Sequence, residues 1–381
     1  MIEIAAKLIR GPVYFSGEVV ECLVTFTNPP NPSHQISQSH SDVFASLAWG
    51  SAQMHCQCST NAKMVLTDKL ISLARPAAIN ANTTFIPWEL DNGYAVMNTK
   101  PKILFCDLRL SPGESKTYVY RETIPSDAPP SYRGQAVKYS YKISFGTQRI
   151  NDSIKLLHVP FRVLSLSEVP EITLCNDSVD LSPNNPFTET QNKETPVDIA
   201  LQTLQNLTAR RSPNFYNVTN VRGRVVRFCL FKNSYKLGED IVGTFDFSNA
   251  TVSCAQVSVA LQSEEYVSDE YKRGKSSAPK LVSYNKHHEV CLGLRYSQLV
   301  LPIPLHVTPD FTTDLVTLKW RLHFEFVTTV KLMELPNERT IDWQGPSSID
   351  VETMIWDLPL HIHPTTTPPN TAPHTTCTLS V

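Results

Sequence analysis

Two cysteines and a histidine close together in the first half of this sequence could bind a metal. His55-Cys56-Gln57-Cys58 combines imidazole and thiol groups, which are the ligand types that zinc prefers. Side chains of an extended strand alternate between its two faces, so Cys56 and Cys58 would share a face that His55 does not. A four-ligand zinc site would need further ligands, and the sequence has no Cys-x-x-Cys to supply them. We interpret the two thiols as core residues.

A histidine run and a glycine-containing segment could serve acid–base or phosphate chemistry. His287-His288-Glu289 brings titratable groups together, but adjacent side chains of an extended strand point apart. Gly113-Glu-Ser-Lys-Thr117 has part of the composition of a phosphate-binding loop. Such a loop needs another glycine where Leu108 stands and a lysine directly after Gly113. We therefore expect a solvated hairpin at the histidines and a strand-joining turn at Ser111-Pro-Gly113.

Other motifs with known chemistry are missing from the sequence. It has no Gly-x-Ser-x-Gly, His-Glu-x-x-His or Gly-x-Gly-x-x-Gly segment. No motif therefore indicates a hydrolase, zinc-protease or dinucleotide-binding site. Acidic residues are spread over loops without visible convergence. We predict no catalytic, cofactor-binding or metal-binding residues and no cofactor. The protein is expected not to be an enzyme and to act by binding.

The elements that would position functional side chains form an internal repeat. Tyr14-Phe-Ser-Gly17-Glu18 in the first half recurs as Tyr235-Lys-Leu-Gly238-Glu239 in the second. Five more anchors follow in the same order: Ala52–Cys56 with Ala255–Val259, Ile124-Pro125 with Ile303-Pro304, Pro130-Ser-Tyr132 with Pro309-Asp-Phe311, Val137-Lys-Tyr139 with Leu318-Lys-Trp320, and Val159-Pro160 with Leu358-Pro359. This order predicts two tandem copies of one domain.

Short segments with period-two alternation predict β-strands in both copies. In the first copy they are 2–8, 19–27, 47–58, 103–110, 116–121, 136–145 and 154–164. In the second they are 225–231, 241–247, 254–262, 288–294, 297–305, 315–327 and 355–363. Such spacing without βαβ alternation predicts an all-β fold of two tandem antiparallel β-sandwiches. The clearest alternation should bury one face: Leu318, Trp320, Leu322, Phe324 and Phe326.

Domain boundaries follow from changes in composition. We place the first sandwich at residues 1–165, a linker at 166–221 and the second sandwich at 222–364. The linker carries Val197, Leu201, Leu204 and Leu207 near helical spacing, which predicts one amphipathic helix. We expect it to dock on a neighbouring sandwich, a partner-binding helix being the alternative. Residues 365–381 are rich in Thr and Pro and are expected to form a disordered tail.

Composition limits the kinds of partner. The 381 residues carry a net charge of −2, with 18% charged residues, so no overall field attracts nucleic acid and we expect no such partner. The first residues lack the features of a signal peptide, and no apolar run is long enough for a membrane span. The nine cysteines are scattered, which is typical of buried thiols in the cytoplasm.

Two tandem sandwiches with a repeated Tyr-x-x-Gly-Glu turn resemble the arrestin fold. Longer segments make the resemblance narrower: Pro101–Leu110, Pro112–Lys116, Pro129–Gln135, Tyr235–Asp240, Leu318–Val327 and Trp356–Leu360. Together they resemble the Rgp family, the smaller subunit of the Ric/Rgp guanine-nucleotide exchange complex of a Golgi Rab GTPase. The resemblance covers most of residues 1–363.

The resemblance implies a function by association. The expected partners are a large Ric subunit in an obligate heterodimer and a Golgi Rab GTPase of the Rab six type, with peripheral contact to Golgi membranes through the complex. The expected role is nucleotide exchange in retrograde traffic, from the cytoplasm. Exchange factors act by differential affinity, without covalent chemistry. The alternative is an arrestin-like adaptor for cargo tails, which predicts Pro-Pro-x-Tyr motifs; the near match, Pro129-Pro-Ser-Tyr132, falls at an expected strand entry.

Overall fold

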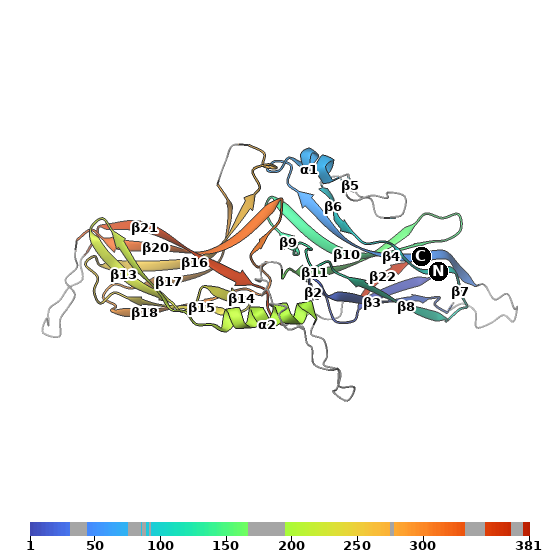
Figure 1. Cartoon of the computed structure of the whole chain (residues 1–381), viewed down its shortest axis with the longest axis horizontal. Coiled ribbons are helices and arrows are strands. Elements are labelled where there is room, and N and C mark those ends of the chain that lie inside the picture. Colours follow the sequence, from blue (N-terminus) through green and yellow to red (C-terminus); the bar gives the residue numbers. More distant parts are fainter. Residues whose placement is uncertain are drawn as a thin grey trace, which may run out of the picture.

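Two β-sandwiches lie end to end in the computed structural model of this chain (Figure 1). It describes residues 1–30, 44–74, 85, 89–90, 93–166, 195–274, 278–331, 347–366 and 376–381. The predicted all-β, two-domain fold is confirmed. None of the helices in these described segments has the length and apolar character to cross a membrane.

The first sandwich packs a four-stranded sheet, β22-β1-β3-β8, on a larger one, β2-β11-β10-β4-β6-β5, in which β7 also pairs with β4 and β9 with β10. Its elements are β1 (Glu3–Leu8), β2 (Val13–Phe15), β3 (Val19–Thr27), β4 (Ala45–Thr60), α1 (Thr67–Ala74), β5 (Glu89–Leu90), β6 (Gly93–Asn98), β7 (Lys102–Leu110), β8 (Ser115–Thr123), β9 (Tyr132–Arg133), β10 (Val137–Gln148), β11 (Lys155–Leu164) and β22 (Thr376–Ser380).

The second sandwich repeats this plan with the sheets β12-β13-β15-β18 and β14-β21-β20-β16-β17, and β19 pairs with β20. Its elements are β12 (Asn214–Asn220), β13 (Gly223–Leu230), β14 (Ser234–Lys236), β15 (Asp240–Asp246), β16 (Cys254–Val267), β17 (Lys280–Val290), β18 (Tyr296–Pro302), β19 (Phe311–Thr312), β20 (Val316–Thr329) and β21 (Val351–His363). The helix α2 (Pro196–Ala209) precedes it.

The repeated Tyr-x-x-Gly-Glu segment forms the same turn in both copies. Gly17 and Gly238 have φ of +86° and +83°, values that favour glycine. The carboxylates of Glu18 and Glu239 each accept a hydrogen bond from the backbone N–H three residues earlier, at 2.8 and 2.9 Å. This turn passes the chain from one sheet to the other, since β2 pairs in parallel with β11 and β14 in parallel with β21.

The expected core face of β20 is confirmed: Leu318, Trp320, Leu322, Phe324 and Phe326 are all buried. The strand expected at 288–294 is wrong, because β17 spans Lys280–Val290. The error has a physical reason: β17 is an edge strand whose two faces are both partly exposed, so burial imposes no strong apolar alternation on it.

The predicted amphipathic helix is α2, and it starts with a capping box. The Thr195 hydroxyl accepts a hydrogen bond from the backbone N–H of Asp198, whose carboxylate accepts one from the Thr195 N–H. Pro196 follows the cap, where its missing N–H costs nothing. Leu204 is buried in the core of the second sandwich, and Val197 lies at the turn of Gly17 in the first. The helix therefore lies across the junction of the two sandwiches (Figure 1).

Two expected boundaries need correction. The linker does not extend to 221, because β12 forms a hairpin with β13, pairing Val218 with Val226. The C-terminal tail is not disordered throughout: β22 pairs antiparallel with β1, and Val381 and Ile2 exchange backbone hydrogen bonds of 2.8 Å. Thr/Pro content suggested disorder, but residues 376–380 alternate and occupy the free edge of β1, where their backbone groups find partners. Residues 367–375 lie outside the described segments.

A buried junction joins the two sandwiches. Glu265 of β16 is 4% exposed. Its carboxylate accepts hydrogen bonds from the backbone N–H groups of Gln135 (2.8 Å) and Ala136 (3.1 Å). Tyr132 and Phe311, which occupy corresponding positions in the repeat, meet edge-on with ring centroids 5.0 Å apart. The corresponding strands β9 and β19 of the two copies thus each supply one ring of this contact.

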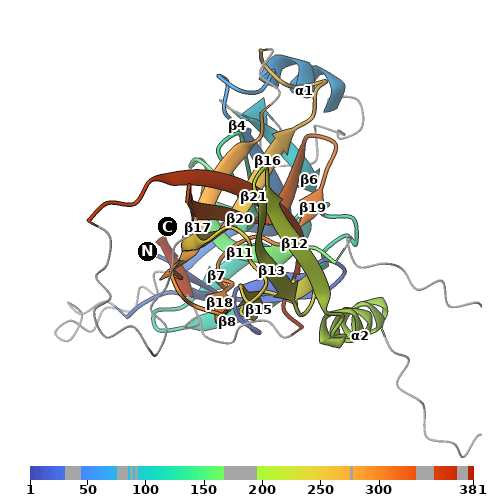
Figure 2. The same cartoon turned by 90° about the vertical axis from the view of Figure 1, so that its left-hand side faces the viewer.

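Two further contacts extend this junction. The Arg162 guanidinium donates hydrogen bonds to the carbonyls of Leu305 (3.2 Å) and Val307 (2.7 Å). The segment between β16 and β17 reaches α1, where the Leu66 N–H donates to the Tyr271 carbonyl at 2.8 Å. Figure 2 shows α1 beside this segment and α2 on another flank of the molecule.

Candidate functional site

The residues considered for metal binding lie in the first sandwich without forming a metal site. Cys56 and Cys58 point into its core, as predicted, and burial raises the pKa of Cys58 to about 12. His55 is buried on the opposite face of β4, and its two ring nitrogens have no hydrogen-bond partner among the described residues. In the part of the chain that the structure describes, no three His, Cys, Asp or Glu side chains are placed to hold a metal ion.

The other two candidate segments lie in an edge strand and in a strand-joining turn, although His287 is half-buried and not solvated as expected. His287 and His288 lie in the edge strand β17, and the nearest carboxylate contact of His287 is Glu289 at 3.7 Å. Gly113 has φ of +85° and donates its N–H to the Asn28 carbonyl at 2.6 Å. It therefore lies in the turn between β7 and β8.

Acidic side chains do converge at one place, contrary to the expectation from the sequence. Arg321 of β20 lies 2.8 Å from the carboxylate of Glu264 on β16 and 3.2 Å from that of Asp357 on β21. His323 Nδ1 lies 2.6 Å from the second oxygen of Asp357. Opposite charges alternate across three neighbouring strands, an arrangement that stabilises sheet pairing. We interpret this group as a cross-strand network.

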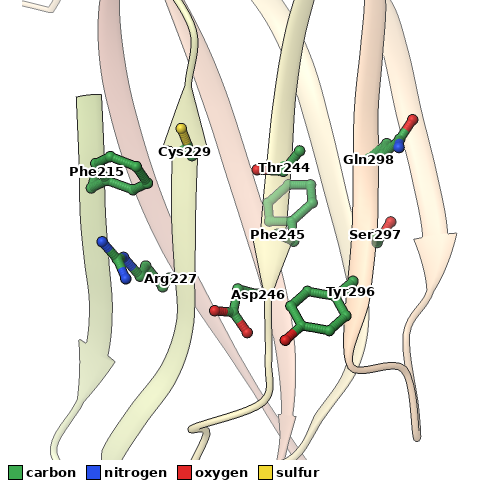
Figure 3. Close-up of a pocket in the computed structure, with 9 residues that line it drawn as sticks. All are labelled: Phe215, Arg227, Cys229, Thr244, Phe245, Asp246, Tyr296, Ser297 and Gln298. Carbon is green, nitrogen blue, oxygen red and sulfur yellow. The ribbon is translucent and has the colours of Figure 1, made fainter. Parts of the chain in front are cut away.

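A hollow of about 380 Å³ lies on the outer face of the sheet β12-β13-β15-β18. Figure 3 shows its lining side chains spread over these four strands. The lining residues are Phe215, Arg227, Cys229, Thr244, Phe245, Asp246, Tyr296, Ser297 and Gln298. The hollow therefore combines aromatic rings, hydroxyl and amide groups, and one charge of each sign.

Strand alternation explains which side chains face outward. Phe215 is 57% exposed on β12 and Tyr296 is 67% exposed on β18, at opposite edges of the sheet. Between them, the guanidinium carbon of Arg227 lies 4.3 Å from the Phe215 ring centroid, a cation–π contact. Asp246 pairs in register with Tyr296, and hydrogen bonds from Ser248 lower the pKa of its carboxyl group.

Apolar side chains continue this surface beyond the hollow. Val242 and Val300 are register partners on β15 and β18, and are 38% and 50% exposed. We call the surface formed by Phe215, Arg227, Val242, Tyr296 and Val300 the aromatic face. Exposed apolar groups gathered on one sheet surface are typical of an interaction site.

The corresponding sheet of the first sandwich has a more polar outer face. Its strands β3 and β8 are joined there by an ion pair between Glu21 and Arg121 at 2.7 Å and by a hydroxyl contact between Thr25 and Thr117 at 2.9 Å. Val119 of β8 is exposed to the same extent as Val300, at 50%. The two copies of one fold thus differ in the chemistry of this outer face.

Sequence reasoning missed the aromatic face. Phe215 fell within the supposed linker, although Asn214–Asn220 alternates as a strand does. Val300 lies within the strand expected at 297–305, whereas Tyr296 precedes it. That these two residues share one sheet surface with Phe215 depends on the pairing of four strands.

The fold and this surface define a tandem β-sandwich protein with an exposed aromatic face on its second sandwich. The chain belongs to the Rgp1 family, whose model matches residues 34–174 and 168–329. It is similar to a Homo sapiens protein named RAB6A-GEF complex partner protein 2, with 42% identity over 378 residues, covering 96% of this chain and 95% of the relative. A Bos taurus protein of the same name is 42% identical over 373 residues, covering 94% of this chain and 93% of the relative.

Proposed function

We propose that this chain is the smaller subunit of a heterodimeric guanine-nucleotide exchange factor for a Rab6-type GTPase. The observation that carries the proposal is 42% identity over almost the whole chain to relatives named as partners in a RAB6A-GEF complex. We further propose that it forms an obligate heterodimer with a large Ric-type subunit. The complex would act from the cytoplasm in retrograde traffic and contact Golgi membranes peripherally.

Nucleotide exchange is compatible with a subunit that contributes surfaces and no covalent chemistry. An exchange factor binds the nucleotide-free GTPase more tightly than the nucleotide-bound form, and this difference in affinity promotes nucleotide release. The aromatic face suits a stable association because tyrosine and arginine carry much of the binding energy in protein interfaces. We assign this face to the large subunit, which should bring apolar groups and a carboxylate to meet Arg227.

The experiment measures release of labelled GDP from the Rab and co-purification of the two subunits. The complex should accelerate release, and this chain alone should do so weakly or not at all, since exchange requires the joint surface. No acceleration by the intact complex would contradict the proposed function. Strong acceleration by this chain alone would contradict its role as a subunit.

A matched pair of variants tests the assignment of the aromatic face. Val300→Asp should lower co-purification of the large subunit at least tenfold, because it buries a charge in an apolar contact. Val119→Asp, at an equally exposed valine on the first sandwich, should leave co-purification unchanged. Equal effects of the two substitutions would contradict the assignment of the aromatic face to the large subunit. They would not bear on the exchange activity, which the GDP-release experiment tests separately.

A further inference from the structure

Two thiols of the second sandwich lie in contact. Cys254 is the first residue of β16 and Cys291 follows the last residue of β17. Their sulfur atoms are 3.3 Å apart, and the Cys291 Sγ also lies 3.6 Å from the Cys254 carbonyl oxygen. The Cys291 N–H donates to the Ala255 carbonyl at 3.0 Å, so the backbone holds the two residues side by side.

The two sulfur atoms lie in non-bonded contact. A disulfide has an S–S distance of about 2.0 Å, so bond formation would bring the sulfur atoms about 1.3 Å closer. Both residues stand at the end of a strand, and the chain turns directly after Cys291, where the Leu294 N–H donates to the Cys291 carbonyl at 3.0 Å. Strand ends open more easily than strand centres. Local opening here would allow the two sulfur atoms to move into bonding distance.

The first copy has no cysteine at the position that corresponds to Cys254. Ser51 occupies the position of Cys254 in the repeat, and its hydroxyl donates to the Lys102 carbonyl at 3.0 Å. Cys56 and Cys58 are as deeply buried as Cys254 and Cys291. No sulfur–sulfur contact joins Cys56 and Cys58 among the described contacts, so burial by itself does not explain the pairing.

We propose that Cys254 and Cys291 form a reversible intramolecular disulfide, a redox-modification site in the second sandwich. The oxidant is a low-molecular-weight disulfide such as oxidised glutathione. One cysteine thiolate attacks this disulfide and releases one glutathione thiol, leaving a mixed disulfide. The second cysteine thiolate then displaces the other glutathione, so two thiols are oxidised, two glutathione thiols are formed and the protons balance.

The sulfur–sulfur contact favours Cys254 as the first nucleophile. The Cys291 S–H donates to the Cys254 sulfur, and this hydrogen bond lowers the pKa of the Cys254 thiol. Thiolates, and not thiols, attack disulfides. Cys254 therefore reacts first, and Cys291 resolves the mixed disulfide.

The cross-link would close the chain between residues 254 and 291. That segment contains the connection from β16 to β17, which contacts α1 of the first sandwich through Tyr271 and through an ion pair between Lys69 and Glu270 at 3.3 Å. A cross-link at the base of this segment restricts the unfolded chain and so stabilises the folded one. Oxidation should thus stiffen an element that joins the two sandwiches.

The test exposes the folded, full-length chain to oxidised glutathione, blocks remaining thiols by alkylation and maps disulfide-linked peptides by mass spectrometry. We expect a linked peptide pair containing residues 254 and 291, removed by a reductant, and a melting temperature raised by several degrees. Cys254→Ser should abolish the linked pair, whereas Cys58→Ser should retain it. Full alkylation of both thiols after oxidation, or a linked pair that forms equally with other cysteines, would overturn the proposal.

A second variant separates the reactive roles. In Cys291→Ser, the glutathione mixed disulfide should accumulate on Cys254, because no resolving thiol is present. In Cys254→Ser, modification of Cys291 should be at least tenfold slower. Equal rates of glutathione addition in the two variants would contradict the assignment of Cys254 as the first nucleophile.

Discussion

At the scale of single residues, His55 combines deep burial with a lack of hydrogen-bond partners among the described groups. Its pKa is lowered from 6.5 to about 4, first by burial and then by His158 and Lys142. His158 is held by a 2.6 Å hydrogen bond between its Nδ1 and the Ser144 hydroxyl. The folded state therefore keeps His55 neutral at a pH where the unfolded chain binds a proton.

This difference predicts a loss of stability in mild acid. The folded pKa lies below the unfolded one, so the contribution is fully present above pH 6.5 and is lost as the pH falls towards about 4. The loss from this residue is at most about 3 kcal/mol. Urea unfolding across this pH range should show a shallower pH dependence for His55→Leu. His306→Leu, at an exposed histidine, should keep the wild-type slope; equal slopes in all three proteins would contradict the prediction.

At the scale of elements, β20 supplies the core of the second sandwich through one face. Trp320 is 1% exposed, and its indole N–H donates to the Thr308 carbonyl at 3.1 Å. The side chain thus combines a large apolar contact with a satisfied polar group.

Trp320→Ala should lower the free energy of unfolding by about 3 to 5 kcal/mol, because it leaves a cavity in a packed core. Trp320→Phe keeps most of the volume and should cost clearly less. Chemical denaturation of the purified variants measures both values. An Ala variant as stable as the wild type would show that the buried face of β20 is wrongly assigned.

The strand β22 completes the sheet of the first sandwich next to β1, in the position that β12 takes next to β13 in the second. Both copies thus use a strand from outside the repeated unit to cover the edge of their first strand. A long uncovered edge presents unpaired backbone groups and promotes association between chains.

Truncation before Thr376 should therefore lower the melting temperature by several degrees and increase self-association. Thr378→Ala changes only an exposed side chain of β22 and should behave as the wild type. Thermal unfolding and size-exclusion chromatography at several concentrations measure the two effects. A monomeric truncated chain with an unchanged melting temperature would contradict a structural role for β22.

At the scale of the whole molecule, the junction makes the two sandwiches depend on each other. The Glu265 carboxylate is satisfied by backbone N–H groups of the other sandwich, and Arg162 donates to two carbonyls across the same boundary. Hydrogen bonds to charged groups contribute about 1.5 to 3 kcal/mol each. These contacts are strong enough to couple the unfolding of the two sandwiches.

Calorimetry of the wild-type chain should accordingly show one cooperative unfolding transition. The double variant Glu265→Ala/Arg162→Ala should split it into two, because each sandwich retains most of its own core. Glu270→Ala, which removes an exposed ion pair with Lys69, should leave a single transition. Two transitions in the wild type would contradict the coupling.

Features that depend on local pattern follow from the sequence alone. The repeated turn at Gly17 and Gly238, the buried face of β20 and the amphipathic helix α2 each follow from residues a few positions apart, where backbone conformation and alternation act directly. The same patterns predicted the all-β, two-sandwich fold. The family membership agrees with the resemblance carried by longer segments.

Contacts between distant residues are visible only in the folded chain. Ile4 pairs with Leu379, Glu265 reaches Gln135, and Cys254 meets Cys291, and no local propensity encodes such approaches. The aromatic face likewise exists only after four strands have paired. Strand register and sheet order depend on burial summed over the whole core. An alternating segment therefore predicts a strand, but it does not predict which strands will pair with it.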